Sequence, residues 1–468
     1  MFRGRIRSIH FIGIGGIGMS GVAEVLLDSG FCVTGSDLRH NEAIAHLVAK
    51  GAQVQQGHDP QHVQAADVVV YSSAVTLDNP EVMAARARSV PVIARAEMLA
   101  ELMRLKDGIA IAGSHGKTTT TSLVATVLRQ AGLDPTVIIG GRLNALGSGA
   151  ARGNGPLLVA EADESDGSFL HLNPTVAVIT NIDAEHLDHY GDFATLQQSF
   201  VDFANRVPFF GLVVACLDHP QLQAVLPRMD KRVTTYGLSA QADYRARQPH
   251  IDGLMTRFQL ERHGEALGPF EVRMPGMHNV LNALATIAVA DELGIDLDVV
   301  RRALSGFAGV QRRFSVLGEA AGVMVVDDYG HHPAEIIATL EAAQRAFDRR
   351  LVVLFQPHRY SRTAALFGEL SQAFNRADVL LVAPIYAAGE VPMAGIDTAA
   401  LVAAIRAHGH RDAAAVGDLA GAIPALEARL RPGDVVLTLG AGSITQVGPN
   451  LLAALRRRPT EGKRAAPS

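Results

Sequence analysis

Cysteine is scarce in this sequence, because 468 residues contain only Cys32 and Cys216. The two match no paired spacing of metal ligands or of a redox motif, which argues against a zinc site or a dithiol centre. Both lie in apolar stretches, so we expect small buried hydrophobic side chains. This usage fits a reducing compartment and favours a cytoplasmic protein.

Long apolar runs and a strong charge of either sign are also missing. No run approaches the roughly 20 apolar residues that a helix needs to cross a bilayer, so we expect no membrane span. Arginines at 3, 5 and 7 precede apolar residues, as in a secretion signal, but glycines at 13, 15, 16 and 18 interrupt that segment. The formal net charge of -5 implies neither a nucleic acid nor an anionic membrane surface as a partner.

What the chain does have is the composition of an ordinary globular protein, with 48% hydrophobic residues. Because domains usually hold roughly 100 to 200 residues, the length suggests about three of them. Short apolar runs alternate with helix-length amphipathic stretches, which predicts an α/β fold with mostly parallel sheets. We place domains at 1–106, 107–315 and 316–456, linkers near 105–108 and 314–318, and a disordered tail at 457–468.

Strands and helices are predicted in each block. In the first, the pattern predicts a strand at 8–12, a helix at 20–29 and a strand at 31–35. In the second, a strand at 108–112 leads through a loop into a helix from 118 to about 130 that Gly132 ends, and strands follow at 157–160 and 176–180. Strands of the third block are predicted at 323–327, 351–355, 379–383 and 435–439.

A phosphate-binding loop is predicted between the first strand and the first helix of the second block. Its residues are Gly113, Ser114, His115, Gly116, Lys117, Thr118 and Thr119. Backbone N–H groups at a helix start hold phosphate oxygens, with Lys117 reaching the terminal phosphates and Thr118 facing magnesium. The motif is shortened, because Ile111 stands where the standard pattern has its first glycine. A chance Gly-Lys-Thr in a helix-start turn is the alternative.

Carboxylates follow the next two strands of that block. The acidic run at 161–166 begins with Glu161 and suits a hard cation such as magnesium, although a solvated acidic loop has the same composition. His186 follows the strand at 176–180 and can add an imidazole ligand or orient a phosphate. Because the carboxyl ends of parallel strands form one sheet edge, we expect both beside the phosphate loop.

A second glycine loop, at 13–18, satisfies the dinucleotide fingerprint, with Asp37 about 20 residues further on. Taken alone it suggests a nicotinamide dehydrogenase. The same geometry binds any diphosphate, because the glycines provide close backbone approach rather than recognition of nicotinamide. A purely structural glycine turn is the third interpretation.

Two late motifs end neighbouring strands of the third block. One runs from 327 to 333 and the other from 356 to 362. Arg359 and Arg362 in the second can clamp a carboxylate or phosphate, although arginines at a helix start are more often simply exposed.

Taken together, the motifs at 13–21, 113–120 and 161–166 and the two late motifs resemble the Mur ligase family, over about 9–444. The resemblance implies a Rossmann-like amino-terminal domain for a UDP-sugar, a central ATPase-like domain with a phosphate loop, and a mobile Rossmann-like carboxy-terminal domain for the incoming amino acid. It implies ATP and magnesium as cofactors.

The resemblance also assigns residues. The UDP-sugar side would be bound by Gly15, Gly16, Ile17, Gly18, Met19, Asp37, Ser72 and Ser73. ATP would be bound by the phosphate loop with His278, Asn279, Asn282, Arg313 and Asp328, and magnesium by Thr118, Glu161 and His186. Tyr329, His331, Arg359 and Arg362 resemble substrate-side residues. The catalytic set would be Lys117, Glu161, His186, His331 and Arg359.

One departure points to a branch of the family. Several sister ligases carry a carbamylated lysine after the His-x-Asp segment, whereas 196–204 here contains no lysine, which leaves the ligands of a second metal unassigned. That absence resembles the alanine-adding branch, which joins L-alanine to UDP-N-acetylmuramate through an acyl phosphate. The alternatives are the tripeptide-recycling ligase of the same family, a nicotinamide-dependent dehydrogenase and a non-catalytic nucleotide switch. The sequence leaves a monomer and a homodimer open.

Overall fold

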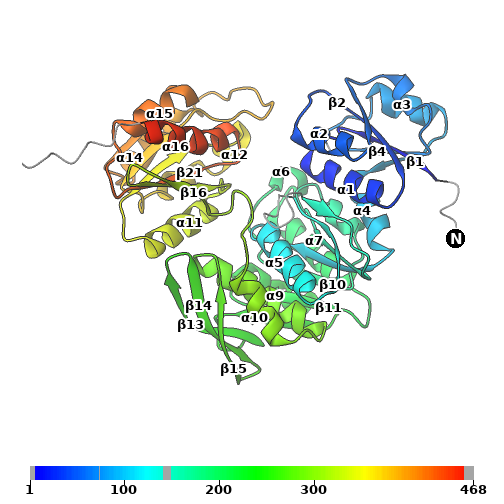
Figure 1. Cartoon of the computed structure of the whole chain (residues 1–468), viewed down its shortest axis with the longest axis horizontal. Helices are drawn as coiled ribbons and strands as arrows, with labels where there is room; N and C mark the ends of the chain where they lie inside the picture. Colours follow the sequence, from blue (N-terminus) through cyan, green and yellow to red (C-terminus); the bar gives the residue numbers. More distant parts are fainter. Residues whose placement is uncertain (1–5, 73, 141–148, 458–468) are drawn as a thin grey trace, which may run out of the picture. The chain divides into compact units, whose positions relative to one another are not determined.

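The computed structural model describes residues 6–72, 74–140 and 149–457. They form two compact units, which we describe separately. The first comprises the described residues up to 248 together with 258–272 and 280–310, and the second comprises 249–257, 273–279 and the described residues from 311. The fold is three-domain α/β with mostly parallel sheets, as the sequence predicts, and each domain has one sheet (Figure 1).

The first sheet has the strand order β3-β2-β1-β4-β5, and every pair in it is parallel. Its strands are β1 (Ser8–Ile12), β2 (Cys32–Asp37), β3 (Gln53–Gln56), β4 (Val68–Tyr71) and β5 (Val92–Ala94). Its helices are α1 (Ile17–Asp28), α2 (Glu42–Ala49), η2 (Pro60–Val63), α3 (Pro80–Ala87) and α4 (Arg95–Met103). The glycine loop therefore follows the central strand, where β2 and β4 flank it.

The second sheet has the order β15-β14-β13-β12-β11-β10-β6-β9-β7-β8. The strands around the phosphate loop are β6 (Asp107–Ala112), β7 (Thr136–Ile138), β8 (Ala150–Ala151), β9 (Leu157–Glu161) and β10 (Val176–Ile179). β6 pairs in parallel with both β9 and β10, and the residues of these strands are almost all buried. Burial on both faces explains why such strands appear in the sequence as continuous apolar runs.

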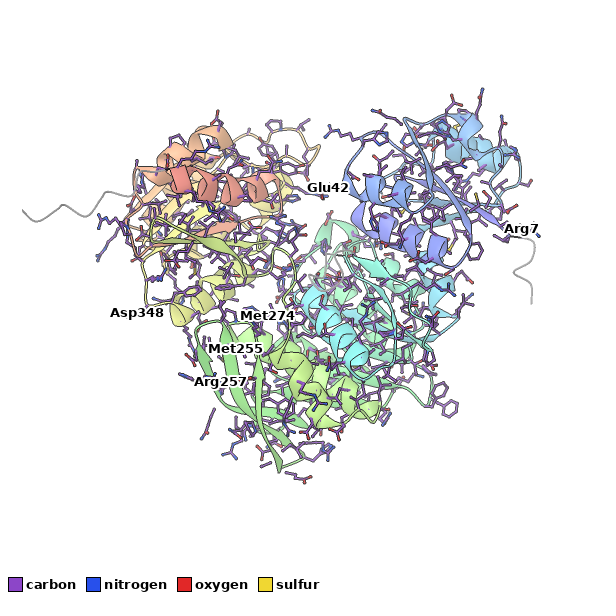
Figure 2. The ribbon with its side chains drawn as sticks, viewed as in Figure 1. Arg7, Glu42, Met255, Arg257, Met274 and Asp348 are labelled. Carbon is purple, nitrogen blue, oxygen red and sulfur yellow. The ribbon has the colours of Figure 1, made fainter. Side chains whose placement is uncertain are left out.

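The remaining strands of this sheet extend it beyond β10. They are β11 (Leu212–Cys216), β12 (Val233–Gly237), β13 (Tyr244–Asp252), β14 (Met255–Arg262) and β15 (Glu265–Val272). The helices are α5 (Lys117–Gln130), η3 (Ser168–His171), α6 (Leu187–Tyr190), α7 (Phe193–Asn205), α8 (Pro220–Val225), η4 (Leu226–Arg228), α9 (Met277–Glu292) and α10 (Leu297–Ser305). Arg257, which Figure 2 labels, lies on β14. It forms an ion pair with Asp252 at 2.5 Å.

The third sheet has the order β16-β17-β21-β18-β19-β20 and is parallel except for the pair β16 and β17. Its strands are β16 (Ser315–Ala320), β17 (Val323–Asp328), β18 (Leu351–Phe355), β19 (Val379–Val382), β20 (Ala413–Ala415) and β21 (Val435–Leu439). Its helices are α11 (Pro333–Ala346), α12 (Tyr360–Ala365), α13 (Phe367–Gln372), α14 (Thr398–Ala407), α15 (Leu419–Glu427), η5 (Ser443–Gln446) and α16 (Val447–Arg457).

Both faces of the third sheet are packed. Val353 on β18 belongs to one buried cluster, with Leu340 of α11 and Leu401 of α14. Its neighbour Leu354 belongs to the other, with Leu451 of α16. Successive strand residues point to opposite faces, so the two clusters fill the two sides of one sheet.

Three expectations from the sequence are wrong in detail. Most of the predicted linker at 314–318 is strand β16, which pairs with β17. Cys32 is exposed, because it is the first residue of β2, whereas Cys216 at the end of β11 is buried as expected. Helix α1 begins at Ile17, three residues before the predicted start, because Gly16 already serves as its N-cap.

The carboxyl end of the described chain is helical to Arg457, so the rest of the predicted tail lies outside the described residues. Among the residues that the structure describes, no helix combines the length and apolarity required to cross a membrane.

Candidate active site

The phosphate loop has a backbone that only glycine allows at two positions. Gly113 has φ +127° and Gly116 has φ +84°. A Cβ atom on Gly113 would lie 2.0 Å from Thr180 Oγ1, and one on Gly116 would lie 2.7 Å from Asn282 Oδ1. The loop leaves β6, and α5 begins at Lys117, so the backbone N–H groups of the first helical turn are available to an anion.

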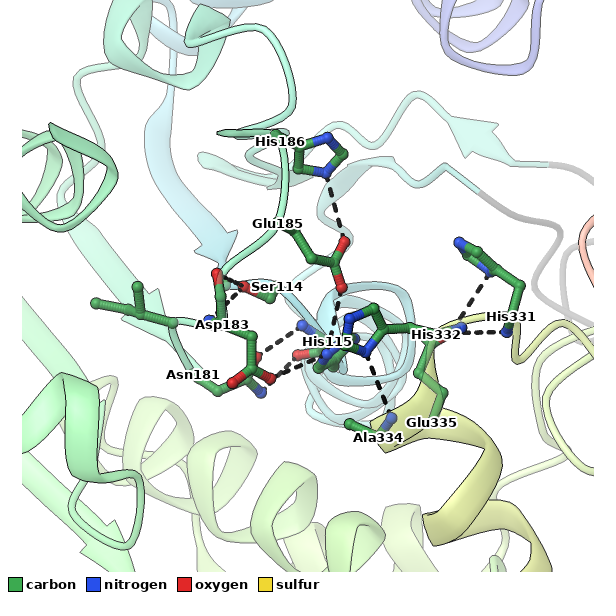
Figure 3. A network of polar contacts seen from close by, with 12 residues as sticks. Ser114, His115, Asn181, Asp183, Glu185, His186, His331, His332, Ala334 and Glu335 are labelled. Carbon is green, nitrogen blue, oxygen red and sulfur yellow. Dashed lines mark hydrogen bonds and ion pairs between the residues drawn. The ribbon is translucent and has the colours of Figure 1, made fainter. Parts of the chain in front are cut away.

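Side chains from the end of β10 fasten this loop. Thr180 Oγ1 donates to the His115 carbonyl (2.6 Å), and Asn181 both donates to that carbonyl (3.0 Å) and accepts from the His115 N–H (2.7 Å). The Asp183 N–H donates to Ser114 Oγ at 2.8 Å (Figure 3). These contacts fix the loop before any nucleotide arrives, which is the preorganisation that anion binding needs.

Lys117 is held by three oxygen atoms. Its ammonium donates to the carbonyls of Gly113 (2.6 Å) and Ser114 (3.2 Å) and to Glu164 Oε1 (2.8 Å). Burial by itself lowers the pKa of Lys117, but Glu164 and Asp163 outweigh it and raise that pKa. Burial raises the pKa of Glu164, whose side chain is only 2% exposed. The two therefore form a buried ion pair at the base of the loop.

A chain of acid and imidazole groups borders the loop. Asp183 contacts His115 Nε2 at 3.0 Å and His219 Nε2 at 3.2 Å, and hydrogen bonds from these two rings lower the pKa of Asp183. Glu185 lies 3.4 Å from His115 and 3.5 Å from His186 (Figure 3). His186 itself has φ 57°, a strained backbone for a residue with a side chain, of the kind that clusters at functional sites.

Glu161 ends β9, the strand beside β6. Its carboxylate reaches toward the loop after β7, because a Cβ atom on Gly140 would lie 2.7 Å from Glu161 Oε2. The buried oxygen Oε2 of Glu164 has no hydrogen-bond partner among the described residues. Hard carboxylate oxygens of this kind, with a threonine at the start of α5, suit a magnesium ion.

The glycine loop of the first sheet is organised by the end of β2. The N–H groups of Gly13 and Ile14 donate to the Ser36 carbonyl (2.8 and 3.1 Å), and the Gly15 N–H donates to Asp37 Oδ2 (2.9 Å). Asn41 donates to the Gly15 carbonyl at 2.9 Å. The Asp37 carboxylate is thus engaged by the loop itself.

The other predicted residues of this loop lie around the same turn. Gly16 caps α1, which Ile17 opens, and the next turn includes Gly18 and Met19, whose side chain is buried. Ser72 follows β4, and its Cβ lies 3.3 Å from the position of a Cβ atom on Gly13. Ser73 lies outside the described residues.

In the second unit, Asp328 ends β17 and orders the residues around it. Its carboxylate accepts from the N–H groups of Phe314 and Gly330, each at 2.7 Å, and burial raises its pKa to about 6. The guanidinium of Arg313 lies 5.1 Å from the centre of the Tyr329 ring and 3.7 Å from Glu335. The predicted residues Arg313, Asp328 and Tyr329 thus lie together.

Imidazoles and arginines gather after β17 and β18. His331 Nδ1 donates to the Tyr329 carbonyl (3.2 Å), and its ring centre lies 5.9 Å from that of His358. Burial lowers the pKa of His331 to about 3 and, with Arg362 and Arg359, lowers that of His358 to about 4. Both rings are therefore neutral at physiological pH. Arg359 has φ 68°, another strained position.

Three predicted residues lie on α9. Asn282 Oδ1 accepts from Thr120 Oγ1 at 3.1 Å and lies against Gly116, so it supports the phosphate loop directly. Asn279 donates to the Pro275 carbonyl (2.8 Å) and contacts His278 at 3.1 Å. His278 also lines a cavity of about 70 Å³.

Three family models cover nearly the whole chain, in the order of the sheets. They are the Mur ligase family, catalytic domain (residues 8–107), the Mur ligase middle domain (111–290) and the Mur ligase, glutamate ligase domain (312–442). The chain belongs to the Mur ligase family.

Named relatives support this membership. A UDP-N-acetylmuramate--L-alanine ligase of Myxococcus xanthus is 60% identical over 96% of this Mur ligase and 96% of its own length. The crystal structure of UDP-N-acetylmuramate-alanine ligase MurC from Thermotoga maritima matches with a TM-score of 0.81 and 32% identity, over 96% of this chain and 98% of that one. A murein peptide ligase from Psychrobacter arcticus matches with a TM-score of 0.70 and 25% identity, over 96% and 99%.

Two residues of this Mur ligase that contact predicted site residues or their neighbours are not predicted from the sequence. Arg95, the first residue of α4, lies against the glycine loop, since a Cβ atom on Gly18 would be 3.0 Å from its Nη1. It also lies 3.8 Å from Asp163. His219 follows β11 and reaches Asp183. Neither stands in a recognisable motif; the only signal is that each follows a strand at the loop-bearing edge.

Proposed function

We propose that this Mur ligase joins L-alanine to UDP-N-acetylmuramate with cleavage of ATP to ADP and phosphate, giving UDP-N-acetylmuramoyl-L-alanine for peptidoglycan precursors. The observation that carries the proposal is 60% identity over nearly the full length to a relative of that name. The phosphate loop, the glycine loop and the paired arginines are groups that suit the three substrates.

ATP would be bound by the phosphate loop, where N–H groups at the start of α5 and the Lys117 ammonium neutralise phosphate charge. Thr118, Glu161 and His186 would hold magnesium, which would neutralise phosphoryl oxygens when bound. Asn282 keeps Gly116 in place through contact with the loop. His278, Asn279, Arg313 and Asp328 remain proposed contacts of the nucleotide.

The proposed reaction needs no protein nucleophile. The muramyl carboxylate attacks the γ-phosphorus and ADP leaves, which forms an acyl phosphate. The L-alanine amine then attacks the acyl carbon, phosphate leaves, and the proton that the amine loses goes to the departing phosphate. The chain contributes positioning and charge neutralisation, and exclusion of water protects the acyl phosphate.

The UDP-sugar would be bound at the glycine loop, where the start of α1 and Arg95 can neutralise a diphosphate. L-Alanine would be bound at the third sheet, where Arg359 or Arg362 suits its carboxylate. His331 and His358, neutral because of their low pKa values, can accept a hydrogen bond there. The domain boundaries, a cytoplasmic location and a monomer or homodimer stay predictions.

A phosphate-release assay with each substrate omitted in turn tests the proposal. We expect release only when ATP, magnesium, UDP-N-acetylmuramate and L-alanine are all present. Phosphate release that does not depend on the sugar and the amino acid would instead identify a nucleotide switch. A change in nicotinamide absorbance with turnover would support the dehydrogenase.

The tripeptide-recycling ligase is the nearer alternative, and the comparisons favour it less, because two solved peptide ligases are 25% and 31% identical, whereas the alanine ligase of Myxococcus xanthus is 60% identical. Competition between L-alanine and L-alanyl-tripeptide as acceptors separates the two. We expect L-alanine to be consumed and the tripeptide to leave its rate unchanged. Preferential use of the tripeptide would overturn the assignment.

A further inference from the structure

A buried carboxylate in the first sheet's domain is surrounded by hydrogen-bond donors. Glu81, at the start of α3, has no exposed side-chain surface. It accepts hydrogen bonds from Ser36 Oγ (2.6 Å), His58 Nδ1 (3.1 Å) and His62 Nδ1 (2.6 Å). The Asp59 N–H adds a contact at 3.3 Å, and His10 Nε2 lies 3.8 Å away. We call these five side chains, Glu81, Ser36, His10, His58 and His62, the Glu81 cluster.

Burial of a carboxylate is costly unless its charge is satisfied, so this cluster needs an explanation. Burial by itself raises the pKa of Glu81, but interactions with His10, Ser36 and His62 outweigh it and lower the pKa to about 2. Within the part of the chain that the structure describes, these groups do not converge at the spacing of a metal site. The negatively charged carboxylate of Glu81 is therefore the common contact of side chains from β1, β2 and the segment around η2.

One of these side chains belongs to Ser36, which connects Glu81 to the glycine loop. The Ser36 hydroxyl donates to Glu81, while the carbonyl of the same residue accepts the N–H groups of Gly13 and Ile14. The next residue, Asp37, holds the Gly15 N–H. The position of Ser36 thus decides where the first amides of the loop lie.

We propose that Glu81 is a positioning residue for the UDP-sugar, which holds Ser36 and through it sets the glycine loop for a diphosphate. This inference rests on the proposed function, because it takes the loop at 13–18 as the diphosphate site. Because its side chain has no exposed surface, Glu81 acts on the loop through Ser36.

The Glu81→Gln substitution keeps the shape of the side chain but removes its charge. It also turns one oxygen into an NH₂ donor that faces donors. We expect the mispaired side chain to move Ser36, and with it the glycine loop, away from the position that binds UDP. Because correcting such a mispaired buried group costs about as much as a tenfold change in an equilibrium constant, we expect the Kd for UDP to rise about tenfold. Ser36→Ala removes only the hydroxyl, and we expect a rise of about threefold.

The matched control is Glu24→Gln. Glu24 on α1 is also a nearly buried carboxylate of this domain, and it accepts from His46 Nε2 and Lys50 Nζ, each at 2.9 Å. These contacts join α1 to α2 and do not include Ser36. We expect this variant to bind UDP as the unchanged protein does.

The experiment is calorimetric titration of each full-length protein with UDP, alongside steady-state kinetics. We expect the KM for the UDP-sugar to rise in Glu81→Gln, with the kcat and the KM for ATP unchanged, a split that a general loss of stability would not give. Circular dichroism checks folding, and if Glu81→Gln fails to fold, Ser36→Ala decides.

The outcomes separate the two levels of inference. If the unchanged protein does not bind UDP, the proposed UDP-sugar site fails. If it binds UDP and both Glu81→Gln and Ser36→Ala bind equally well, the role of Glu81 is overturned while the site stands. An equal loss in Glu24→Gln would also overturn it, because the effect would then not pass through Ser36.

Discussion

At the scale of single residues, Lys117 and Glu164 depend on each other. A buried ion pair that loses one partner leaves an uncompensated charge, which costs about 3 kcal/mol. We therefore expect Lys117→Ala to abolish phosphate release and also to lower the free energy of unfolding. The double variant Lys117→Ala with Glu164→Gln should regain stability but not activity.

Phosphate release and thermal unfolding of both variants check this expectation. Appreciable ADP formation by folded Lys117→Ala would contradict the assignment of Lys117. Equal stability of the single and double variants would show that the ion pair contributes nothing to the fold.

We expect the ionisation of Glu81 to contribute to the pH dependence of the free energy of unfolding. Its pKa is lowered to about 2 in the folded protein, so its stabilising effect is complete above the unfolded pKa and is lost as the pH falls toward 2. A shift from 4.5 to about 2 corresponds to about 3 kcal/mol.

Thermal midpoints between pH 3 and pH 7 measure this effect. We expect Glu81→Gln to melt below the unchanged protein at pH 7, with the gap narrowing as the pH approaches 3. The groups that face Glu81 are His10 from β1, Ser36 from β2, and His58 and His62 near η2. A gap that is constant with pH would contradict the low pKa.

Some site residues could be located from the sequence, because the ends of apolar runs predict the ends of strands. Lys117, Glu161 and His186 follow three apolar runs, and parallel strands bring their carboxyl ends to one edge. Arg95 and His219 could not be found, because their importance comes from neighbours that are distant in the chain. The roles of all these residues stay predictions.

At the scale of elements, the phosphate loop and the end of α5 offer a paired test of glycine. Gly113 has φ +127° and no room for a Cβ atom, whereas Gly132 has φ +76° with nothing within 4 Å. We expect Gly113→Ala to abolish nucleotide binding, because the loop must leave Thr180. Gly132→Ala should cost about 1 kcal/mol of stability and keep activity.

Titration with ADP and magnesium, followed by fluorescence of a labelled nucleotide, compares the two variants. Normal binding by Gly113→Ala would mean that the loop tolerates another conformation, and that its glycine is not required for the anion.

Strands that are buried on both faces were the easiest elements to predict. The bounds of β1, β18 and β21 agree with the sequence pattern, because apolar residues dominate each strand. β18 is a continuous apolar run, β21 contains one polar residue, Thr438, and β1 contains Ser8 and His10. The sequence predicts a linker where β16 lies, because residues 315–320 contain no such run. Pairing with β17, which makes it a strand, is a tertiary effect that the local sequence does not carry.

At the scale of the whole molecule, different substrates should protect different sheets. If UDP binds at the first sheet and nucleotide at the second, each should slow amide exchange at its own loop. We expect UDP to protect residues 13–19 and ADP with magnesium to protect residues 113–119, because bound N–H groups exchange more slowly. Hydrogen-exchange mass spectrometry measures both, and UDP protection confined to 113–119 would contradict the assignment of domains.

The two thiols differ enough to be told apart by a reagent. Cys32 is exposed at the start of β2, whereas Cys216 is buried and its pKa is raised to about 11 by that burial. Since the thiolate is the reactive form, a maleimide dye at neutral pH would attach at one position only. The natural sequence thus already supplies a single-site reporter on the domain proposed to receive the nucleotide-sugar, without any engineered cysteine.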